Sequence, residues 1–375
     1  MHQNIKIALV SFFGILFATP HIASYFNLNK IEKYAIPVTH DYHMPLTIDQ
    51  WFLGRYQLNS DRYFRENYGI RNLSIRTQNQ LDYWLFSEAN AKDVIVGKEG
   101  YLFEQNYINS YLGINFSGAI KIQEQGKKLE LVQDTLAKLG KNLITIIAPG
   151  KGYFYPEYIP NKFKRKSRQT NYSEFINTAE SYRLNVLDLN RYFIENKGKT
   201  NYPLYGKNGI HWSYYGMCFA TDTIIKHIEK STAKPISHAV WDAVERDRER
   251  TYDYDIAEGM NLLSTLDGNK MGYPNIRFVK DPAASKLKTI VIADSYFWGM
   301  YNANFPSILG HSQFWYYNRQ VYPDSYTAPV YVKDKNISEE ILNTDLFLII
   351  CTEGNLQDFG WGVVEELYSH FYGAH

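Results

Sequence analysis

The chain has 375 residues, enough for one large domain with additions or for two modest domains. Its 40 basic and 39 acidic residues give a formal net charge of +1, so no bulk electrostatic attraction to nucleic acid is expected. The sequence holds 32 Tyr, 21 Phe and 7 Trp. Aromatic rings stack on sugars and on protein surfaces alike, so this composition is only a soft indication of carbohydrate contact.

The N-terminus is typical of an export or anchoring segment. Met1–Lys6 is short and basic, Ile7–Ala18 is apolar, and a weaker apolar stretch extends to about Phe26. A cleaved signal peptide and a signal anchor both fit, since the whole stretch approaches the roughly 20 residues that a membrane span requires. Pro20 and the lack of a clear Ala-x-Ala cleavage site leave both open. We favour an uncleaved anchor at residues 1–26, with the rest of the chain in the periplasm or outside the cell.

Residues 27–93 are predicted to be a helical extension, in which Leu73–Phe86 has the spacing of an amphipathic helix. From residue 94 onward, apolar strand-like runs alternate with helical segments. Residues 234–286 break this rhythm and are expected to be an insertion of irregular elements. The organisation therefore predicts three parts, residues 1–26, 27–93 and 94–375.

The part from residue 94 is predicted to be an α/β domain. Leu143–Ala148, Thr289–Ile292 and Leu346–Cys351 are continuous apolar runs, as expected for parallel strands covered on both faces. Lys121–Leu139 has the apolar spacing of a helix, and a second helix is expected from Trp212 to about Lys230. This alternation predicts a doubly wound parallel sheet.

Ser295 is the candidate nucleophile. It follows the apolar strand 289–292 through Ala293-Asp294, and an aromatic segment with helical potential comes next. A strand that delivers a serine to a helix start exposes the hydroxyl near backbone N–H groups, which can stabilise an oxyanion. Asp-Ser after a strand is also an ordinary helix N-cap, so the serine needs further support.

Other polar residues follow the predicted strands and loops. His211 lies at the mouth of a helix and could act as a general base, although most of the ten histidines must be structural or exposed. Trp212, which follows it, is expected to line the same site. Lys151 could face a site or be a solvated loop lysine. Asn355 could donate to an oxyanion, or Gly354-Asn355 could be a simple turn with Glu353 as a cap. No pattern for a metal, nucleotide or other cofactor is present.

Five blocks in order resemble the alginate O-acetyltransferase AlgJ/AlgX family. They are Val94–Phe103 (VIVGKEGYLF), Ala148–Pro160 (APGKGYFYPEYIP), Asn208–Gly216 (NGIHWSYYG), Asp255–Leu263 (DIAEGMNLL) and Ile292–Ser295 (IADS). The resemblance implies an SGNH-hydrolase-like fold with a permuted motif order. It also implies that Ser295 is the nucleophile, that His211 is its base and, more weakly, that Asn355 belongs to the oxyanion hole.

One departure from the family pattern concerns the residue that orients the histidine. The family has an acidic residue two positions before it, in Asp-x-His-Trp, whereas this chain has Gly209 there and Asn208 one position earlier. Asn208 could orient His211 through its carbonyl, a carboxylate from elsewhere such as Glu353 or Asp294 could complete the triad, or the enzyme could be slow or inactive.

The resemblance implies an extracytoplasmic O-acyltransferase that acetylates a polysaccharide through an acyl-serine intermediate. It implies an acyl donor, a polysaccharide acceptor and a multispanning membrane O-acyltransferase as partner. Two alternatives are also compatible with the sequence. An esterase of the same fold would transfer the acyl group to water, and a non-catalytic polysaccharide-binding or assembly subunit would explain the missing aspartate.

Overall fold

The computed structural model describes residues 2–26, 43–67, 69–163, 169–279 and 281–373. The chain divides into two compact units, which consist of residues 1–91 with 258–265, and of residues 92–257 with 266–375. Residues 27–42 of the predicted helical extension lie outside the described residues, and the three-part division stays a prediction. Each unit is described by itself.

The first unit begins with an apolar helix, α1 (His2–Tyr25). Its most apolar window, Gln3–Pro20, has 18 residues and a mean hydropathy of 1.3. By length and composition α1 can cross a membrane, and a signal sequence near an N-terminus has the same properties. The helix thus agrees with both interpretations of the N-terminal segment.

The rest of the first unit consists of α2 (Ile48–Phe52), α3 (Arg55–Asn67), α4 (Arg71–Phe86) and the segment 258–265. The helix predicted at residues 73–86 is present as α4. Its side chains hold the distant segment through backbone groups. The Arg76 Nε donates to the Leu262 carbonyl at 2.9 Å, and the Asn79 amide donates to the Met260 carbonyl at 3.0 Å. These bonds explain why residues 258–265 group with this unit.

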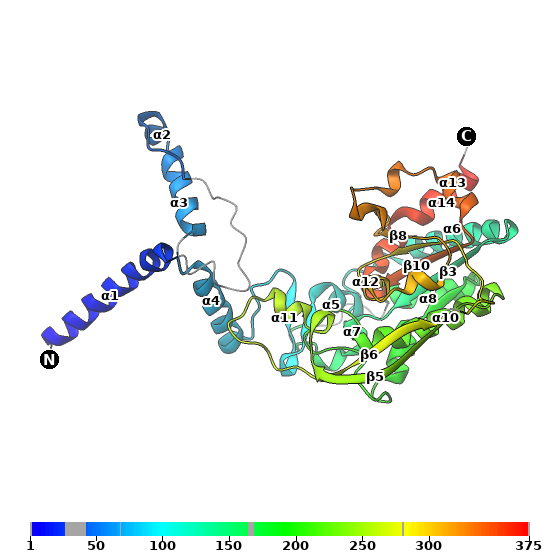
Figure 1. Ribbon diagram of the computed structural model, residues 1–375, viewed down its shortest axis with the longest axis horizontal. Coiled ribbons are helices and arrows are strands. Elements are labelled where there is room, and N and C mark those ends of the chain that lie inside the picture. Colours follow the sequence, from blue (N-terminus) through cyan, green and yellow to red (C-terminus); the bar gives the residue numbers. More distant parts are fainter. Residues whose placement is uncertain (1, 27–42, 68, 164–168, 280, 374–375) are drawn as a thin grey trace. The chain divides into compact units, whose positions relative to one another are not determined.

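The second unit is built on a six-stranded sheet in the order β4-β3-β10-β7-β8-β9 (Figure 1). The strands are β3 (Asn142–Ala148), β4 (Val186–Asp188), β7 (Thr289–Ala293), β8 (Ser312–Tyr316), β9 (Gln320–Tyr322) and β10 (Leu346–Thr352). The pairs from β4 to β8 are all parallel, and β9 runs antiparallel to β8 at the edge. The predicted parallel α/β sheet is confirmed.

Alternate residues of the central strands enter two separate hydrophobic clusters, one on each face of the sheet. In β10, Leu348 and Ile350 belong to one cluster, whereas Phe347 and Ile349 belong to the other. Successive side chains of a strand point to opposite faces, so a strand covered on both sides must be apolar at every position. That requirement explains the unbroken run LFLIIC at residues 346–351.

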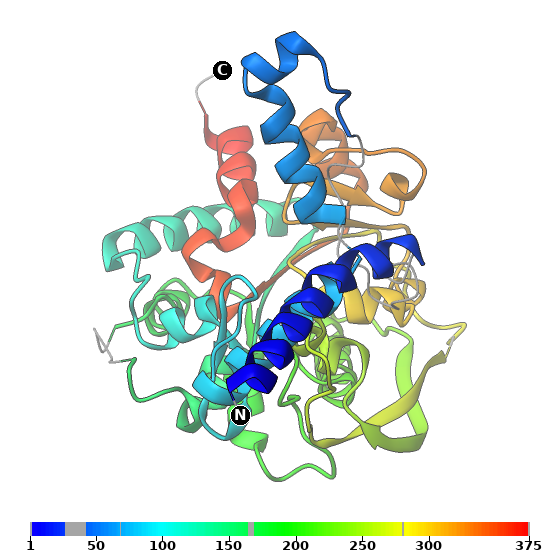
Figure 2. The same cartoon turned by 90° about the vertical axis from the view of Figure 1, so that its left-hand side faces the viewer.

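Helices cover both faces of the sheet (Figure 2). The first face is covered by α5 (Gln105–Tyr111), α7 (Lys151–Phe154), α9 (Leu189–Asn196), α10 (Tyr214–Thr232) and α12 (Phe297–Asn302). The second is covered by α6 (Ala119–Lys138), α8 (Asn171–Ser181), α13 (Ile337–Asn343) and α14 (Val363–Tyr372). Helices on both faces of a mainly parallel sheet make this a doubly wound unit.

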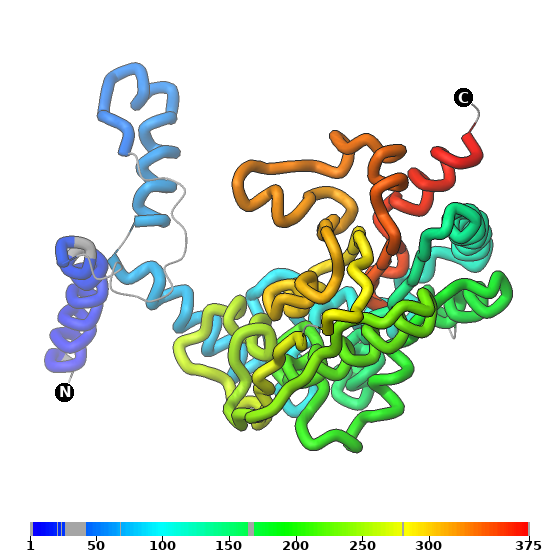
Figure 3. The backbone as a smooth tube through the Cα atoms, turned by 45° about the vertical axis from the view of Figure 1, so that its right-hand side comes forward, coloured from blue at the N-terminus to red at the C-terminus, as the bar shows by residue number. Residues whose placement is uncertain are grey.

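Two antiparallel pairs accompany the sheet. The short strands β1 (Val94–Val96) and β2 (Leu102–Glu104) flank a turn at Lys98–Gly100. The ribbon of β5 (His238–Arg248) and β6 (Lys270–Val279) replaces the irregular insertion expected at residues 234–286, as the tube in Figure 3 shows in yellow-green. That prediction was wrong because β5 is rich in charged residues and β6 contains Gly272 and Pro274, so neither sequence has a clear apolar alternation.

Candidate active site

Ser295 lies just beyond the carboxyl end of the central strand β7, which ends at Ala293. The chain then enters α12, which begins at Phe297. The side chain of Ser295 is neither fully buried nor fully exposed. Because ligands of open α/β sheets bind at the carboxyl ends of the strands, Ser295 occupies a position suited to chemistry.

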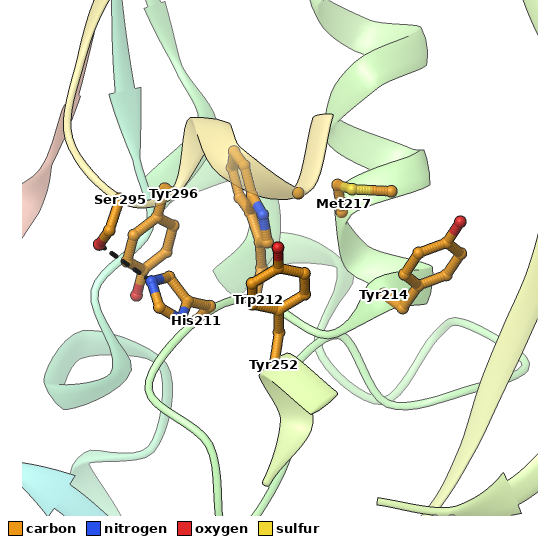
Figure 4. Close-up of a pocket in the computed structure, with 8 residues that line it drawn as sticks. His211, Trp212, Tyr214, Met217, Tyr252, Ser295 and Tyr296 are labelled. Atoms are coloured by element: carbon orange, nitrogen blue, oxygen red, sulfur yellow. Dashed lines mark hydrogen bonds between the residues drawn. The ribbon is translucent and has the colours of Figure 1, made fainter. Parts of the chain in front are cut away.

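His211 contacts Ser295 directly. Its Nε2 lies 2.9 Å from the Ser295 Oγ, and this is the dashed line in Figure 4. His211 comes from the loop before α10, so residues 84 positions apart in the sequence meet at the sheet edge. A hydroxyl within hydrogen-bond distance of an imidazole can transfer its proton to the ring as it attacks a carbonyl carbon.

Asp255 holds the other side of the His211 ring. Its Oδ2 lies 2.7 Å from Nδ1, and its Oδ1 accepts the backbone N–H groups of Ile210 and Ile256, both at 2.8 Å. The carboxylate is thus fixed by two backbone donors, and its free oxygen favours the tautomer with the proton on Nδ1. In this tautomer Nε2 can accept the proton of Ser295.

Asn208 does not contact the imidazole, in contrast to the prediction. Its amide instead donates to the Asp267 carbonyl at 3.1 Å. A Cβ on Gly209 would lie 2.4 Å from the Tyr252 carbonyl oxygen, so the segment leading to Asp255 passes against this glycine. The family's aspartate position therefore has no room for a side chain, and the carboxylate comes from the crossing segment.

Lys151 holds the loop before His211 in place through hydrogen bonds to its backbone. It is completely buried, and its Nζ donates to the carbonyls of Lys207 at 2.9 Å and Gly209 at 2.6 Å. Burial lowers the pKa of Lys151 to about 7. The interpretation as a solvated loop lysine is wrong, and the side chain acts on the site through the backbone that carries His211.

Asp294 and Asn355 bind each other rather than His211 or an open site. The Asp294 Oδ2 accepts the Asn355 amide at 2.9 Å, and it also accepts the Thr352 backbone N–H and hydroxyl, both at 2.8 Å. Burial raises the pKa of the Asp294 carboxyl. The orienting role that the sequence allowed for Asp294 is thus contradicted, and one N–H of the Asn355 amide is directed at Asp294.

The hydrogen bonding of Glu353 does not involve the His211 imidazole either. It is completely buried, its Oε1 accepts the Ser110 hydroxyl, and its Oε2 has no hydrogen-bond partner among the described residues. A Cβ on Gly150 would lie 2.1 Å from that Oε2, so the carboxyl packs against a glycine backbone. Burial raises the pKa of Glu353 to about 8. It therefore does not serve as the orienting carboxylate that the sequence allowed.

Replacing Glu353 by glutamine is expected to change how stability depends on pH. Between a pKa of about 4.3 in the unfolded chain and about 8 in the fold, only the folded state keeps the proton. The free energy of unfolding of the wild type therefore falls as pH rises through this window. Thermal melting from pH 5 to 8.5 should show Glu353→Gln gaining on the wild type with rising pH. Parallel curves would contradict this, and exposed Glu124→Gln is the control.

A small pocket opens beside Ser295 and His211. It is lined mainly by apolar and aromatic side chains, and Figure 4 places Trp212 and Tyr252 between Ser295 and the far end formed by Tyr214 and Met217. Gly299 completes the lining. Among the described residues, no group of three or more His, Cys, Asp or Glu side chains could hold a metal ion. The predicted lining role of Trp212 agrees with this pocket.

The family model described as the SGNH hydrolase-like domain of acetyltransferase AlgX matches residues 94–254. This segment is AlgX-like. The matched residues include His211 and end one residue before Asp255, so the triad is completed by residues beyond the match. The AlgJ/AlgX resemblance and the SGNH-hydrolase-like fold predicted from the sequence are thereby confirmed. A search of curated proteins found no match.

Solved structures that are similar to this chain include those of AlgJ, AlgX and PatB1. The O-acetyltransferase domain of Pseudomonas putida AlgJ is 15% identical, with 74% of this chain and 99% of that chain covered and a TM-score of 0.49. Pseudomonas aeruginosa AlgX is 11% identical, with 72% of this chain and 67% of that chain covered and a TM-score of 0.45. Bacillus cereus PatB1 with a sulfonyl adduct is 12% identical, with 65% of this chain and 93% of that chain covered and a TM-score of 0.44.

Asp255 is the site residue that sequence reasoning missed. It lies in one of the five family-like blocks and begins the short helix α11 (Asp255–Gly259), so an aspartate at a helix start was visible. Its separation of 44 residues from His211 gave no local indication that the two meet.

Proposed function

We propose that the protein is an O-acetyltransferase of the SGNH type that modifies a polysaccharide through an acyl-serine intermediate. The observation that carries this proposal is the hydrogen-bonded chain from Asp255 through His211 to Ser295 at the end of a central strand. The AlgX-type family match over residues 94–254 supports acetyl transfer as the reaction.

The geometry suits a two-step transfer. In the first step the Ser295 oxygen attacks the carbonyl carbon of the acyl donor while His211 Nε2 takes the hydroxyl proton, and the leaving group departs with that proton. Asp255 stabilises the imidazolium formed in between. In the second step a sugar hydroxyl gives its proton to Nε2 and attacks the acyl-serine, which releases the acetylated sugar and restores Ser295.

The assembly-subunit alternative was motivated by the missing aspartate beside His211. Asp255 removes the reason for this alternative, because it supplies the carboxylate from another segment of the chain. An esterase would use the same triad with water as acceptor. We propose that α1 anchors the protein in a membrane and that the reaction takes place outside the cytoplasm. A membrane O-acyltransferase would then be the source of the acyl groups.

A donor and acceptor assay tests this function. The protein is supplied with 4-nitrophenyl acetate and a panel of oligosaccharides, and the products are measured by mass spectrometry. The proposal expects acetylated oligosaccharide that disappears in Ser295→Ala. Free acetate alone across acceptors that are shown to bind would reject the transferase in favour of the esterase.

The apolar pocket is suited to the acyl group and sets its length. A Cβ on Gly299 would lie 2.9 Å from the Met217 Sδ, so Met217 and the α12 backbone close the far end. We expect Met217→Ala to raise the preference for a butyryl over an acetyl ester by about tenfold, since an added methylene in a matched apolar pocket changes selectivity by roughly 10 to 200-fold.

Rates with 4-nitrophenyl acetate and butyrate measure this preference. Buried Met300 lies on α12 but does not line the pocket, so Met300→Ala controls for the loss of a buried side chain. An unchanged ratio of butyryl to acetyl rates in a folded Met217→Ala protein would show that the acyl group binds elsewhere.

A further inference from the structure

The carbonyl oxygen of an acyl-serine needs hydrogen-bond donors, and one of the two N–H groups of the Asn355 amide is already bound to Asp294. An oxyanion develops beside the backbone N–H of the nucleophile, so further donors must lie near that group. The residues around the Ser295 N–H therefore decide which side chain can complete the oxyanion hole.

Tyr317 lies beside Ser295 because of the sheet register. In the parallel pair of β7 and β8, Ala293 is opposite Tyr316, and the Tyr317 backbone N–H donates to the Ala293 carbonyl at 2.9 Å. The two strands thus end together, and the residues that follow them, Ser295 and Tyr317, are brought to one point of the sheet edge.

The phenol oxygen of Tyr317 faces both polar groups of the serine. Interactions with the side chain and with the backbone of Ser295 both act to lower the pKa of the Tyr317 phenol, so both groups of the serine lie close to the phenol oxygen. Burial raises the pKa of Tyr317, so the phenol keeps its proton near neutral pH and can donate it. Tyr317 does not line the apolar pocket, so an acyl group in that pocket leaves the phenol free to face the carbonyl oxygen.

The backbone that presents Tyr317 is strained and is held by a second loop. Tyr317 has φ 51° and Asn318 has φ 50°, in the left-handed region that bulky L-residues rarely adopt. The Asn318 side-chain amide donates to the Trp361 carbonyl at 3.2 Å. The rings of Tyr317 and Trp361 pack edge to face, with 5.1 Å between their centroids. Trp361 itself has φ 47°. Strained backbone that is held in place by surrounding contacts is typical of functional sites.

We propose that Tyr317 is an oxyanion-hole donor of this enzyme, acting together with the backbone N–H of Ser295. When the acyl carbonyl oxygen arrives, the Ser295 N–H exchanges the phenol oxygen for the carbonyl oxygen, and the phenol O–H donates to the same atom. The negative charge that forms as the serine adds to the carbonyl is then shared by two donors. This inference rests on the proposed acyl-serine mechanism.

Stopped-flow release of 4-nitrophenolate from 4-nitrophenyl acetate gives the acylation rate, and mass spectrometry gives the decay of the acyl-enzyme. We expect Tyr317→Phe to slow both steps by about 10²-fold, as loss of one oxyanion donor does. The phenyl ring keeps its contact with Trp361, so the melting temperature should change little. Tyr316→Phe removes the neighbouring half-buried hydroxyl and should leave both rates within about threefold.

Acylation by Tyr317→Phe within about threefold of the wild type would overturn the inference. A variant that acylates normally and loses only transfer to oligosaccharide would also overturn it, because Tyr317 would then contact the acceptor. A wild type that forms no acyl-Ser295 would reject the proposed function itself, and this result differs from a defect confined to the variant.

Discussion

Asp255→Asn should lower acetyl transfer by about 10⁴-fold, the size of effect seen when the carboxylate of a serine triad becomes an amide. The reason lies in the bonding of Asp255. Its Oδ1 accepts two backbone N–H groups, so the carbonyl of an asparagine must take that position and its NH₂ must face His211 Nδ1. The amide then donates to Nδ1 and moves the ring proton to Nε2, which can no longer accept the Ser295 proton.

Steady-state rates with 4-nitrophenyl acetate and acceptor saccharide measure this loss. Asp242→Asn is the matched control, because Asp242 is an exposed carboxylate on β5 that pairs with Arg277. The control should keep nearly full activity. A folded Asp255→Asn protein that keeps more than about a tenth of the wild-type rate would show that the carboxylate does not set the tautomer of His211.

Ser295→Ala should lower acetyl transfer by at least about 10⁴-fold, because no other group can carry the acyl intermediate in the proposed mechanism. The change removes one hydroxyl from a partly exposed side chain, so stability should be close to that of the wild type. Residual activity should be insensitive to a second change at His211, since members of a triad act as a unit.

The product assay with saccharide acceptor and a thermal melt measure both expectations. Ser307→Ala removes an exposed hydroxyl further along the chain and serves as the control. Transfer by Ser295→Ala within about tenfold of the wild type would exclude the acyl-serine route.

Much of the second unit was predictable because its strands are buried on both faces. Runs such as 143–148 and 346–351 are typical of central strands in a covered sheet, and both pair in parallel as expected. The β5–β6 ribbon was not predicted because the charge-rich β5 and the glycine- and proline-containing β6 lack a regular apolar alternation. In the first unit only the helices could be predicted. The contact of residues 258–265 with α4 could not be, because it depends on side chains that are far apart in the sequence.

Ser295 and His211 could be selected from the sequence because each stands at a junction of elements, one after a strand and the other before a helix. The structure brings them together. Their orienting carboxylate could not be selected in the same way. Gly209 indicates only a close backbone approach, and that the approaching segment carries Asp255 is a matter of three-dimensional packing.

The sequence left open whether Asp294 and Lys151 face the site, and in the structure both stabilise the backbone around it. Asp294 joins the ends of β7 and β10 through Thr352, and Lys151 binds the carbonyls of the loop that carries His211. Polar side chains at the carboxyl ends of buried strands have two uses, chemistry and the satisfaction of loose backbone groups. Sequence alone does not separate these uses, because both require the same residue types at the same places.

Capture of the acyl-enzyme tests the central claim most directly. The protein is mixed with 4-nitrophenyl acetate, quenched in acid within seconds and digested, and the acetylated peptide is sequenced by mass spectrometry. The mechanism predicts an acetyl group on Ser295 in the wild type, and none there in His211→Ala over the same interval. An acetyl group on another residue, or equal acetylation of Ser295 without His211, would contradict the account.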